Sequence, residues 1–391
     1  MRRVSARLAR LQGSATMAIS GRARQLVAEG RDVISFGAGE PDFPTPEHIT
    51  AAAARAAYDP ANHHYTSNAG LPPLREAIAE YTRHYSRVEV DASEVVVTNG
   101  AKQAVFQTFA ALVDPGDEVL VPSPYWVTYP AGIELFGGVP IPVATGVDAG
   151  FKVSVDDLEA ARTPKTKLLV FVSPSNPTGA VYTADEARVI GEWAKENDVW
   201  VMADEIYQRL VYFTDVAPSI AAVTPRMENF VLVNGVAKSY AMTGWRVGWM
   251  VGPKDVIDAA ERHQSHATSN VANIAQCAAL AALQGSQGTV DEMRQAFDNR
   301  RKLMFSLASE IPGVSVIEPE GAFYLYPDVT EAIDGRFESS AALAIALLEE
   351  AHVAVVAGES FGTPGYIRLS YATSEDEIKA GMERIADFMS R

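Results

Sequence analysis

Three features are scarce in this sequence of 391 residues, and each scarcity excludes a class of protein. Cysteine occurs once, as Cys277, which forbids an internal disulfide and fits a reducing compartment. No apolar run approaches the ~18 residues of a membrane span, so a membrane is not an expected partner. Basic side chains number 33 against 49 acidic ones, giving a net charge of −16. Because such a charge repels phosphate backbones, nucleic acid is not an expected partner either.

Histidine is also sparse, with seven in the chain. The two close pairs, His63/His64 and His263/His266, have no companion cysteine or carboxylate at the spacing of a metal site. The sequence therefore predicts no metal ligands.

Acidic side chains are missing from the first 28 residues, which hold six arginines. An Arg-rich, acid-poor start is typical of an organellar transit peptide. The alternative is a basic arm that packs on the acidic protein or on a second copy of it. We favour the arm, and we expect the chain to work in the cytoplasm.

The rest of the composition is globular, with 48% hydrophobic and 21% charged residues. From Asp32 to about Pro253, short β-branched runs alternate with helical segments. The runs are apolar nearly throughout, which indicates strands covered on both faces. This alternation predicts an α/β fold with a mostly parallel, doubly wound sheet of seven strands. The expected strands are Val33–Phe36, Val95–Thr98, Val119–Val121, Leu168–Val172, Val199–Ala203, Phe230–Val233 and Val247–Val251.

Three helix starts carry capping signals. Thr45 before Pro46 predicts an N-cap with proline at the first helical position. The capping box from Thr183 to Glu186 predicts a helix to about Asn197. A second box, Thr289-x-x-Glu292, predicts a long helix to about Ser309.

The pattern changes after residue 288, where short strands alternate with helices in an α+β unit. The expected elements are strands Val314–Ile317, Phe323–Tyr326, Val353–Val356 and Ile367–Tyr371, and helices Ser340–Glu350 and Glu375–Met389. We divide the chain into an N-terminal arm with part of the small domain (1–45), a large domain (46–288) and a small C-terminal domain (289–391).

Lys238 is the first candidate for chemistry. It follows the expected strand Phe230–Val233, where open α/β sheets place their ligands. Partial burial there would lower the pKa of its amine towards that of a usable nucleophile. Arg246, eight residues on, suits an anionic group such as a phosphate. The alternative is a surface lysine and a structural arginine that flank a turn.

The segment Gly235–Gly248 contains Gly-Val-Ala-Lys-x-x-Ala-Met-x-Gly-Trp-Arg-Val-Gly. It resembles the pyridoxal-phosphate attachment signature of class I aminotransferases. From Ile34 to the end, the chain is similar to the bacterial I-gamma subgroup of aspartate aminotransferases. The resemblance implies pyridoxal 5'-phosphate as cofactor, a large and a small domain, and a homodimer that shares its active sites.

The resemblance assigns roles around the cofactor ring. Asp204 would keep the pyridine nitrogen protonated, so that the ring acts as an electron sink. Tyr207 and Asn176 would hydrogen-bond the phenolic oxygen, and Trp126 would stack on the ring. Without the resemblance, Asn176-Pro-Thr-Gly is a turn, Asp204 is a strand-end acid and Trp126 is a core side chain.

The resemblance also assigns the phosphate site. Gly100, Ala101 and Lys102 open a helix after the strand Val95–Thr98, and free amides at a helix start bind phosphate. Arg246 would join them. Tyr65 would reach the phosphate of the neighbouring subunit.

For the substrate, Arg368 matches the arginine that takes the α-carboxylate as a bidentate pair. Gly39 matches the glycine whose backbone faces the same carboxylate, and Trp126 and Asn176 line the pocket. The Gly37–Asp42 segment lacks the last glycine of a dinucleotide loop, so NAD is not an expected cofactor.

Two positions depart from the family pattern. Many relatives use a partner arginine for the second carboxylate of the substrate, but Gln264–Asn270 contains none, and Ser265 stands near that place. In the I-gamma subgroup the lysine of Gly-Ala-Lys takes this role, which nominates Lys102. Ala237 stands where serine is common before the lysine.

The expected activity is ping-pong transamination from L-aspartate to 2-oxoglutarate through a Schiff base on Lys238. One alternative is another donor or acceptor, such as prephenate/arogenate, an aromatic or a specialised amino acid, because Thr16-Met17 with Lys102 also resembles prephenate-using relatives. A lyase or oxidase on the same scaffold, and a binding protein that keeps the cofactor without turnover, also stay open.

Overall fold

A seven-stranded sheet forms the centre of the computed structural model, which describes residues 3–11, 13 and 15–390. Only β8 runs antiparallel, to both β2 and β7, so the prediction of a mostly parallel sheet is confirmed. Across the sheet the order is β2 (Val95–Thr98), β8 (Gly248–Val251), β7 (Phe230–Gly235), β6 (Trp200–Asp204), β5 (Thr166–Val172), β3 (Glu118–Ser123) and β4 (Val139–Ala144).

Two strands differ from the prediction. Val33–Phe36 yields β1 (Ile34–Ser35), which pairs with β10 (Val353–Ala354) in a separate two-stranded sheet. The seventh strand of the large sheet is β4, which the sequence did not suggest because it contains Pro140 and Pro142. Proline is tolerated there because β4 is an edge strand, paired with β3 alone.

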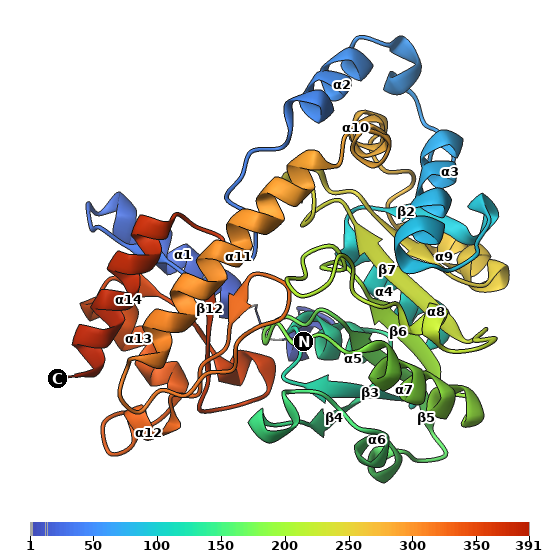
Figure 1. The fold of residues 1–391 in the computed structure, drawn as a ribbon. Helices are drawn as coiled ribbons and strands as arrows, with labels where there is room; N and C mark the ends of the chain where they lie inside the picture. The colour runs from blue at the N-terminus through green and yellow to red at the C-terminus, as the bar shows by residue number, and fades with distance from the viewer. Residues whose placement is uncertain (1–2, 12, 14, 391) are drawn as a thin grey trace.

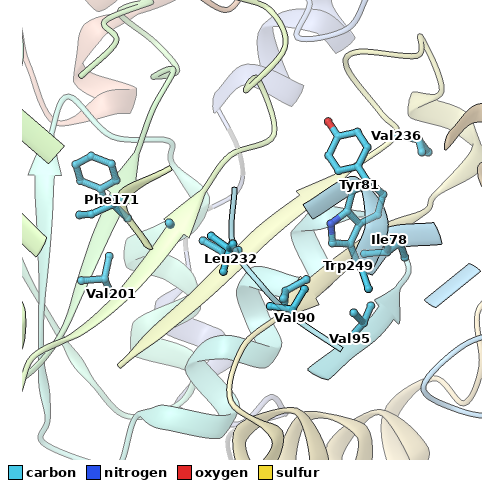
Figure 2. Packing of buried hydrophobic residues seen from close by; sticks show 14 of the residues in the cluster. Ile78, Tyr81, Val90, Val95, Phe171, Val201, Leu232, Val236 and Trp249 are labelled. Carbon is cyan, nitrogen blue, oxygen red and sulfur yellow. The ribbon is translucent and has the colours of Figure 1, made fainter. Parts of the chain in front are cut away.

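Both faces of the large sheet are covered, as the continuous apolar runs predicted. Along β2, Val95 and Val97 join one hydrophobic cluster and Val96 joins another. Figure 2 shows Trp249 of β8 beside Tyr81, with ring centroids 5.6 Å apart. One face carries α2 (Glu47–Ala57), α3 (Pro72–Tyr81), α6 (Val155–Ala161), α7 (Ala184–Glu196), α8 (Ile220–Val223) and α10 (Asn273–Gln284); the other carries α4 (Ala101–Leu112), α5 (Thr128–Leu135) and α9 (Lys254–Ala267).

A second group of elements lies beside this layer, and the long α11 (Gly288–Ser309) runs from one to the other (Figure 1). Its three-stranded sheet has the order β11 (Val356–Ala357), β12 (Ile367–Ser370) and β9 (Tyr324–Leu325). The helices predicted at Ser340–Glu350 and Glu375–Met389 are confirmed as α13 and α14, and α12 covers Thr330–Ile333. The strand predicted at Val314–Ile317 is wrong: this described stretch holds a single bridge, from Ser315 to Asp328.

Short helical turns complete the described part of the chain. They are the 3-10 helices Leu8–Arg10, Pro60–His63, Ala92–Glu94, Val147–Ala149, Thr243–Trp245 and Gly358–Phe361, and the π-helix Thr82–Ser86.

Of the three predicted caps, only one forms. Thr183 accepts from the amide of Glu186 at 3.2 Å, and the Glu186 carboxylate accepts from the amide of Thr183 at 2.7 Å. Thr45 does not cap α2, because its hydroxyl donates to the carbonyl of Ala241.

The predicted cap at Thr289 is also wrong. The helix α11 begins at Gly288, so Thr289 lies inside its first turn and cannot be the N-cap. The hydroxyl of Thr289 is buried there and has no hydrogen-bond partner among the described residues.

The N-terminal helix packs on the second group of elements. In α1 (Ala15–Ala28), Ala23 and Leu26 join a cluster with Leu348 and Ala354. Arg22 donates to the Glu349 carboxylate at 2.7 Å. The side chains of Thr16 and Met17, which were weighed for prephenate, lie outside the described part of this helix. Among the described residues, none of the helices combines the length and apolarity that crossing a membrane requires.

Candidate active site

A cavity of about 890 Å³ opens at the carboxyl ends of β5, β6 and β7. Ligands bind at this end of open parallel sheets because the connecting loops diverge there. Ten of the twelve residues predicted from the sequence line it: Gly39, Ala101, Lys102, Trp126, Asn176, Asp204, Tyr207, Lys238, Arg246 and Arg368. The other two, Gly100 and Tyr65, lie outside the lining.

Lys238 lies three residues past the end of β7 and points into the cavity. Its amine donates to the carbonyl of Gly39. Burial, together with the nearby Arg368 guanidinium, lowers the pKa of Lys238 to about 8. An amine with this pKa exchanges a proton readily near neutral pH.

Asp204 is the last residue of β6, and its side chain is buried. Its Oδ2 accepts from the Tyr129 hydroxyl at 2.8 Å, and its Oδ1 accepts from the amide of Ile206 at 3.2 Å. Burial raises the pKa of Asp204, whereas both hydrogen bonds and the Lys238 charge oppose that rise. The carboxylate is therefore suited to hold a cationic nitrogen inside the cavity.

Positive groups gather at the start of α4. Arg246 lies in the turn between β7 and β8, and its guanidinium donates to the carbonyl of Thr243 at 2.9 Å and of Asn99 at 3.3 Å. A Cβ on Gly100 would lie 2.4 Å from Nη2 of Arg246, and the φ of +78° at this residue favours glycine. The guanidinium and the amides at the start of α4 make a site that could hold a phosphate, and we call it the phosphate cradle.

Lys102 and Trp126 form the wall beside this cradle. The Lys102 amine lies 4.9 Å from the centroid of the Trp126 ring. Burial and the Arg246 charge lower the pKa of Lys102. The Trp126 ring is half-buried and presents a surface to the cavity.

Arg368, on β12, faces the cavity from the opposite wall. Its Nη1 donates to Oδ1 of Asn176 at 2.9 Å, and its Nη2 donates to the carbonyl of Gly37 at 3.0 Å. Its Nε is buried and has no hydrogen-bond partner among the described residues. A guanidinium held in this way suits a carboxylate ligand.

Sequence reasoning missed two tyrosines of the lining, Tyr129 and Tyr324. Tyr129 stands three residues after Trp126, a spacing that places both on one side of a helical turn. Tyr324 lies within a strand that was predicted, but pairing with β12 turns it towards Arg368. The cavity wall from α1, which includes Ala23 and Val27, had no local signal in the sequence.

Tyr65 is an exposed residue, with 91% of its surface accessible to solvent. It follows the short helix Pro60–His63, beside α2, and does not line the cavity of its own chain. Within one chain, the structure does not bring this predicted residue to the site.

Comparison with known proteins places these features in a family. The sequence matches the family model of aminotransferase class I and II over residues 31–385. An aspartate aminotransferase of Streptomyces avermitilis is 55% identical over 395 residues, covering 100% of this chain and 97% of the relative. An aspartate/prephenate aminotransferase of Cereibacter sphaeroides is 44% identical, covering 97% of each chain.

Among solved structures, the aspartate aminotransferase of Thermus thermophilus with maleate aligns with a TM-score of 0.94 and 42% identity. The alignment covers 99% of this chain and 100% of that chain. Family match, sequence identity and fold agree over nearly the whole length. The chain belongs to the class I and II aminotransferases and is a pyridoxal-phosphate-dependent enzyme.

Proposed function

We propose that the enzyme moves the amino group of L-aspartate to 2-oxoglutarate by a ping-pong mechanism, with the cofactor carried covalently on Lys238. One observation carries the proposal: an amine of lowered pKa, a buried carboxylate and a substrate-facing arginine line the same cavity. The relatives from Streptomyces and Thermus are aspartate aminotransferases, which supports aspartate as the donor.

The described residues fit pyridoxal phosphate at both ends. Arg246 and the first residues of α4, Ala101 and Lys102, line the same cavity and together suit the phosphate. Asp204 offers a carboxylate for the pyridine nitrogen. We assign Tyr207 and Asn176 to the phenolic oxygen, and Trp126 to the face of the ring.

When bound, the cofactor withdraws electrons from the Cα of the substrate. Once the amino group of the substrate has displaced Lys238, the freed amine would take the proton from Cα and deliver it to C4′ of the cofactor, and its pKa of about 8 suits both tasks near neutral pH. The bonds that Tyr129 and the amide of Ile206 donate to Asp204 favour its anionic form against the effect of burial. Arg368 binds the α-carboxylate and orients the Cα–H bond towards Lys238.

For the second carboxylate of the substrate we propose Lys102. Gln264–Asn270 has no arginine to offer, and the Lys102 amine lies in the cavity wall over the Trp126 ring. The Thermus structure is described with maleate, which is also a dicarboxylate. The alternative is that Lys102 neutralises the phosphate together with Arg246.

We further propose a homodimer in the cytoplasm, in which Tyr65 of one copy reaches the phosphate of the other. Two exposed tyrosines support a contact between copies of the chain. Tyr58 and Tyr65, on either side of the short helix Pro60–His63, are 88% and 91% exposed. Large apolar side chains exposed together favour a protein contact. We keep 1–45, 46–288 and 289–391 as the proposed domain division.

A second candidate is use of prephenate as amino acceptor. Ala23, Val27 and Val33 add an apolar wall to the cavity, which suits a ring-bearing substrate. The Cereibacter relative, an aspartate/prephenate aminotransferase, also supports this candidate.

The test is an assay of the holoenzyme with L-aspartate and 2-oxoglutarate, in which oxaloacetate and glutamate are both measured. We expect equal amounts of the two products, with Lys238→Ala as the inactive control. Prephenate in place of 2-oxoglutarate tests the second candidate. Release of ammonia or consumption of oxygen without glutamate would instead indicate a lyase or an oxidase. Cofactor binding without any of these products would indicate a binding protein.

A further inference from the structure

Tyr324 is a fully buried residue of the cavity wall that none of the roles above uses. It belongs to β9 of the three-stranded sheet, whereas Tyr207 follows β6 of the seven-stranded sheet. The two hydroxyl oxygens nevertheless lie 2.9 Å apart. Tyr324 thus connects the two sheets at the point where they face the cavity.

The ring of Tyr324 contacts the substrate side of the site. The Arg368 guanidinium lies 4.4 Å from its centroid. The register pairs Ser370 with Tyr324, and because Arg368 is two residues from Ser370, it lies on the same face of the sheet. A Cβ on Gly39 would lie 3.2 Å from the Tyr324 hydroxyl, so that hydroxyl also lies against the backbone that accepts from Lys238.

The positions of the two hydroxyl protons of Tyr207 and Tyr324 determine which acceptor Tyr207 donates to. Burial raises the pKa of both tyrosines, so both stay neutral and each keeps one proton. Only one proton fits between the two oxygens. The Arg368 charge favours donation from Tyr324, because that guanidinium lies over its ring. Either hydroxyl could be the donor of this bond. When Tyr324 donates, Tyr207 accepts, and the proton of Tyr207 is left for another acceptor in the cavity.

We propose that Tyr324 is a positioning residue: its hydroxyl turns the proton of Tyr207 towards the phenolic oxygen of the cofactor, and its ring holds Arg368 for the substrate carboxylate. This rests on the roles proposed above for Tyr207 and Arg368. One side chain then aligns the cofactor contact and the substrate contact, which come from different sheets.

The two functions separate by substitution. Tyr324→Phe removes the hydroxyl and keeps the ring, whereas Tyr324→Leu removes both. Tyr371→Phe is the matched control, because Tyr371 is equally buried and its hydroxyl lies 3.4 Å from that of Tyr212, outside the cavity lining. The readouts are the pH at which the absorbance of the bound cofactor changes, and the dissociation constant of maleate.

A bond donated to the anionic phenolic oxygen lowers the pH of the absorbance change, so weaker donation by Tyr207 raises it. We expect Tyr324→Phe to raise it by about half a unit, the effect of one hydrogen bond, with maleate binding changed less than about twofold. Tyr324→Leu should also weaken maleate binding about tenfold, because the ring under the guanidinium is lost. Tyr371→Phe should change neither readout.

A double substitution tests whether Tyr324 acts through Tyr207. In a Tyr207→Phe background, Tyr324→Phe should shift the absorbance change no further. An unchanged midpoint in Tyr324→Phe, or a full additional shift in the double variant, would overturn the inference while the proposed function stands. A wild-type protein that binds neither pyridoxal phosphate nor maleate would overturn both. The Phe variant keeps the ring and nearly all the volume, so it decides the hydroxyl's role even where Tyr324→Leu fails to fold.

Discussion

The two walls of the cavity are built differently. The wall assigned to the cofactor stands on the ends of β5, β6 and β7, strands of seven, five and six residues with neighbours on both sides. The opposite wall, with Arg368 and Tyr324, stands on strands of two to four residues, joined by a helix from the other end of the chain. The first wall is fixed by the core of the large sheet, and the second by a separate, smaller assembly. Substitutions can therefore be directed at each wall separately, apart from Tyr324, which we propose serves both.

The substitution with the largest expected effect is Lys238→Ala, which tests whether the wall assigned to the cofactor carries the chemistry. Loss of the residue that moves the proton should lower turnover by about 10⁴-fold, the upper end of the usual contribution of an acid–base group, and equally for every donor. The phosphate cradle should still hold the cofactor. Borohydride reduction of the wild-type holoenzyme, followed by peptide mapping, should label Lys238 alone. A label on another lysine would overturn the assignment.

Asp204→Ala tests the same wall at its centre. Turnover should fall about 10³-fold, because a preorganised charge aimed at the reacting ring is lost. Cofactor affinity should fall by only about tenfold, the value of one charge-assisted hydrogen bond. Tyr129→Phe, which removes one donor to Asp204, is the graded control and should have a smaller effect in the same direction. Normal turnover in Asp204→Ala would mean that another group holds the ring nitrogen.

Lys102→Ala tests whether Lys102 serves the substrate or the phosphate, because this residue lies next to the phosphate cradle yet is assigned to the substrate. Loss of a partner for a carboxylate should cost about 2–4 kcal/mol, or roughly 30- to 1,000-fold in kcat/KM for aspartate and 2-oxoglutarate. With alanine as donor, kcat/KM should change little. Equal losses for both kinds of donor would assign Lys102 to the phosphate.

The smallest expected effect concerns stability alone. Burial raises the pKa of Glu205 to about 7 from an ordinary 4.5. Between these values the unfolded chain releases a proton that the folded chain keeps, so the free energy of unfolding falls as the pH rises. Glu205→Gln should remove this penalty and raise the free energy of unfolding by about 2–3 kcal/mol at pH 8. At pH 4 the two proteins should differ little. Urea unfolding at both values measures the difference, and a gain independent of pH would show that ionisation is not its cause.

Most of the fold was predictable because its signals are local. The boundaries of α13 and α14 follow from apolar periodicity and, at Ser339 and Ser374, from capping side chains. The partner of a strand is not a local property. β1 therefore joined the wrong sheet in the prediction, and β4 was hidden by its two prolines.

The same limit applies to the site. Lys238, Asp204 and Arg246 were found because each lies within a recognisable motif: Lys238 follows β7, Asp204 ends β6 and Arg246 precedes β8. The Tyr207–Tyr324 contact was not found, because 117 positions separate the two residues and only the packing of two sheets brings them together. Tyr129 likewise meets Asp204 across 75 positions.

The turn between β7 and β8 sets the spacing between two residues of the cavity. It carries Lys238 near its start and Arg246 near its end, and a Cβ on Gly248 would lie 2.3 Å from the amide nitrogen of Ala101, which fixes where β8 begins against α4. A molecule that engages both residues must match the span between them. One inserted residue would move one end by up to about 3.3 Å, more than a hydrogen bond tolerates. If Lys238 and Arg246 hold the cofactor as we propose, the length of this turn limits the size of the ligand. We then expect weaker binding of the unphosphorylated form of the cofactor, which reaches Lys238 but leaves Arg246 without a partner.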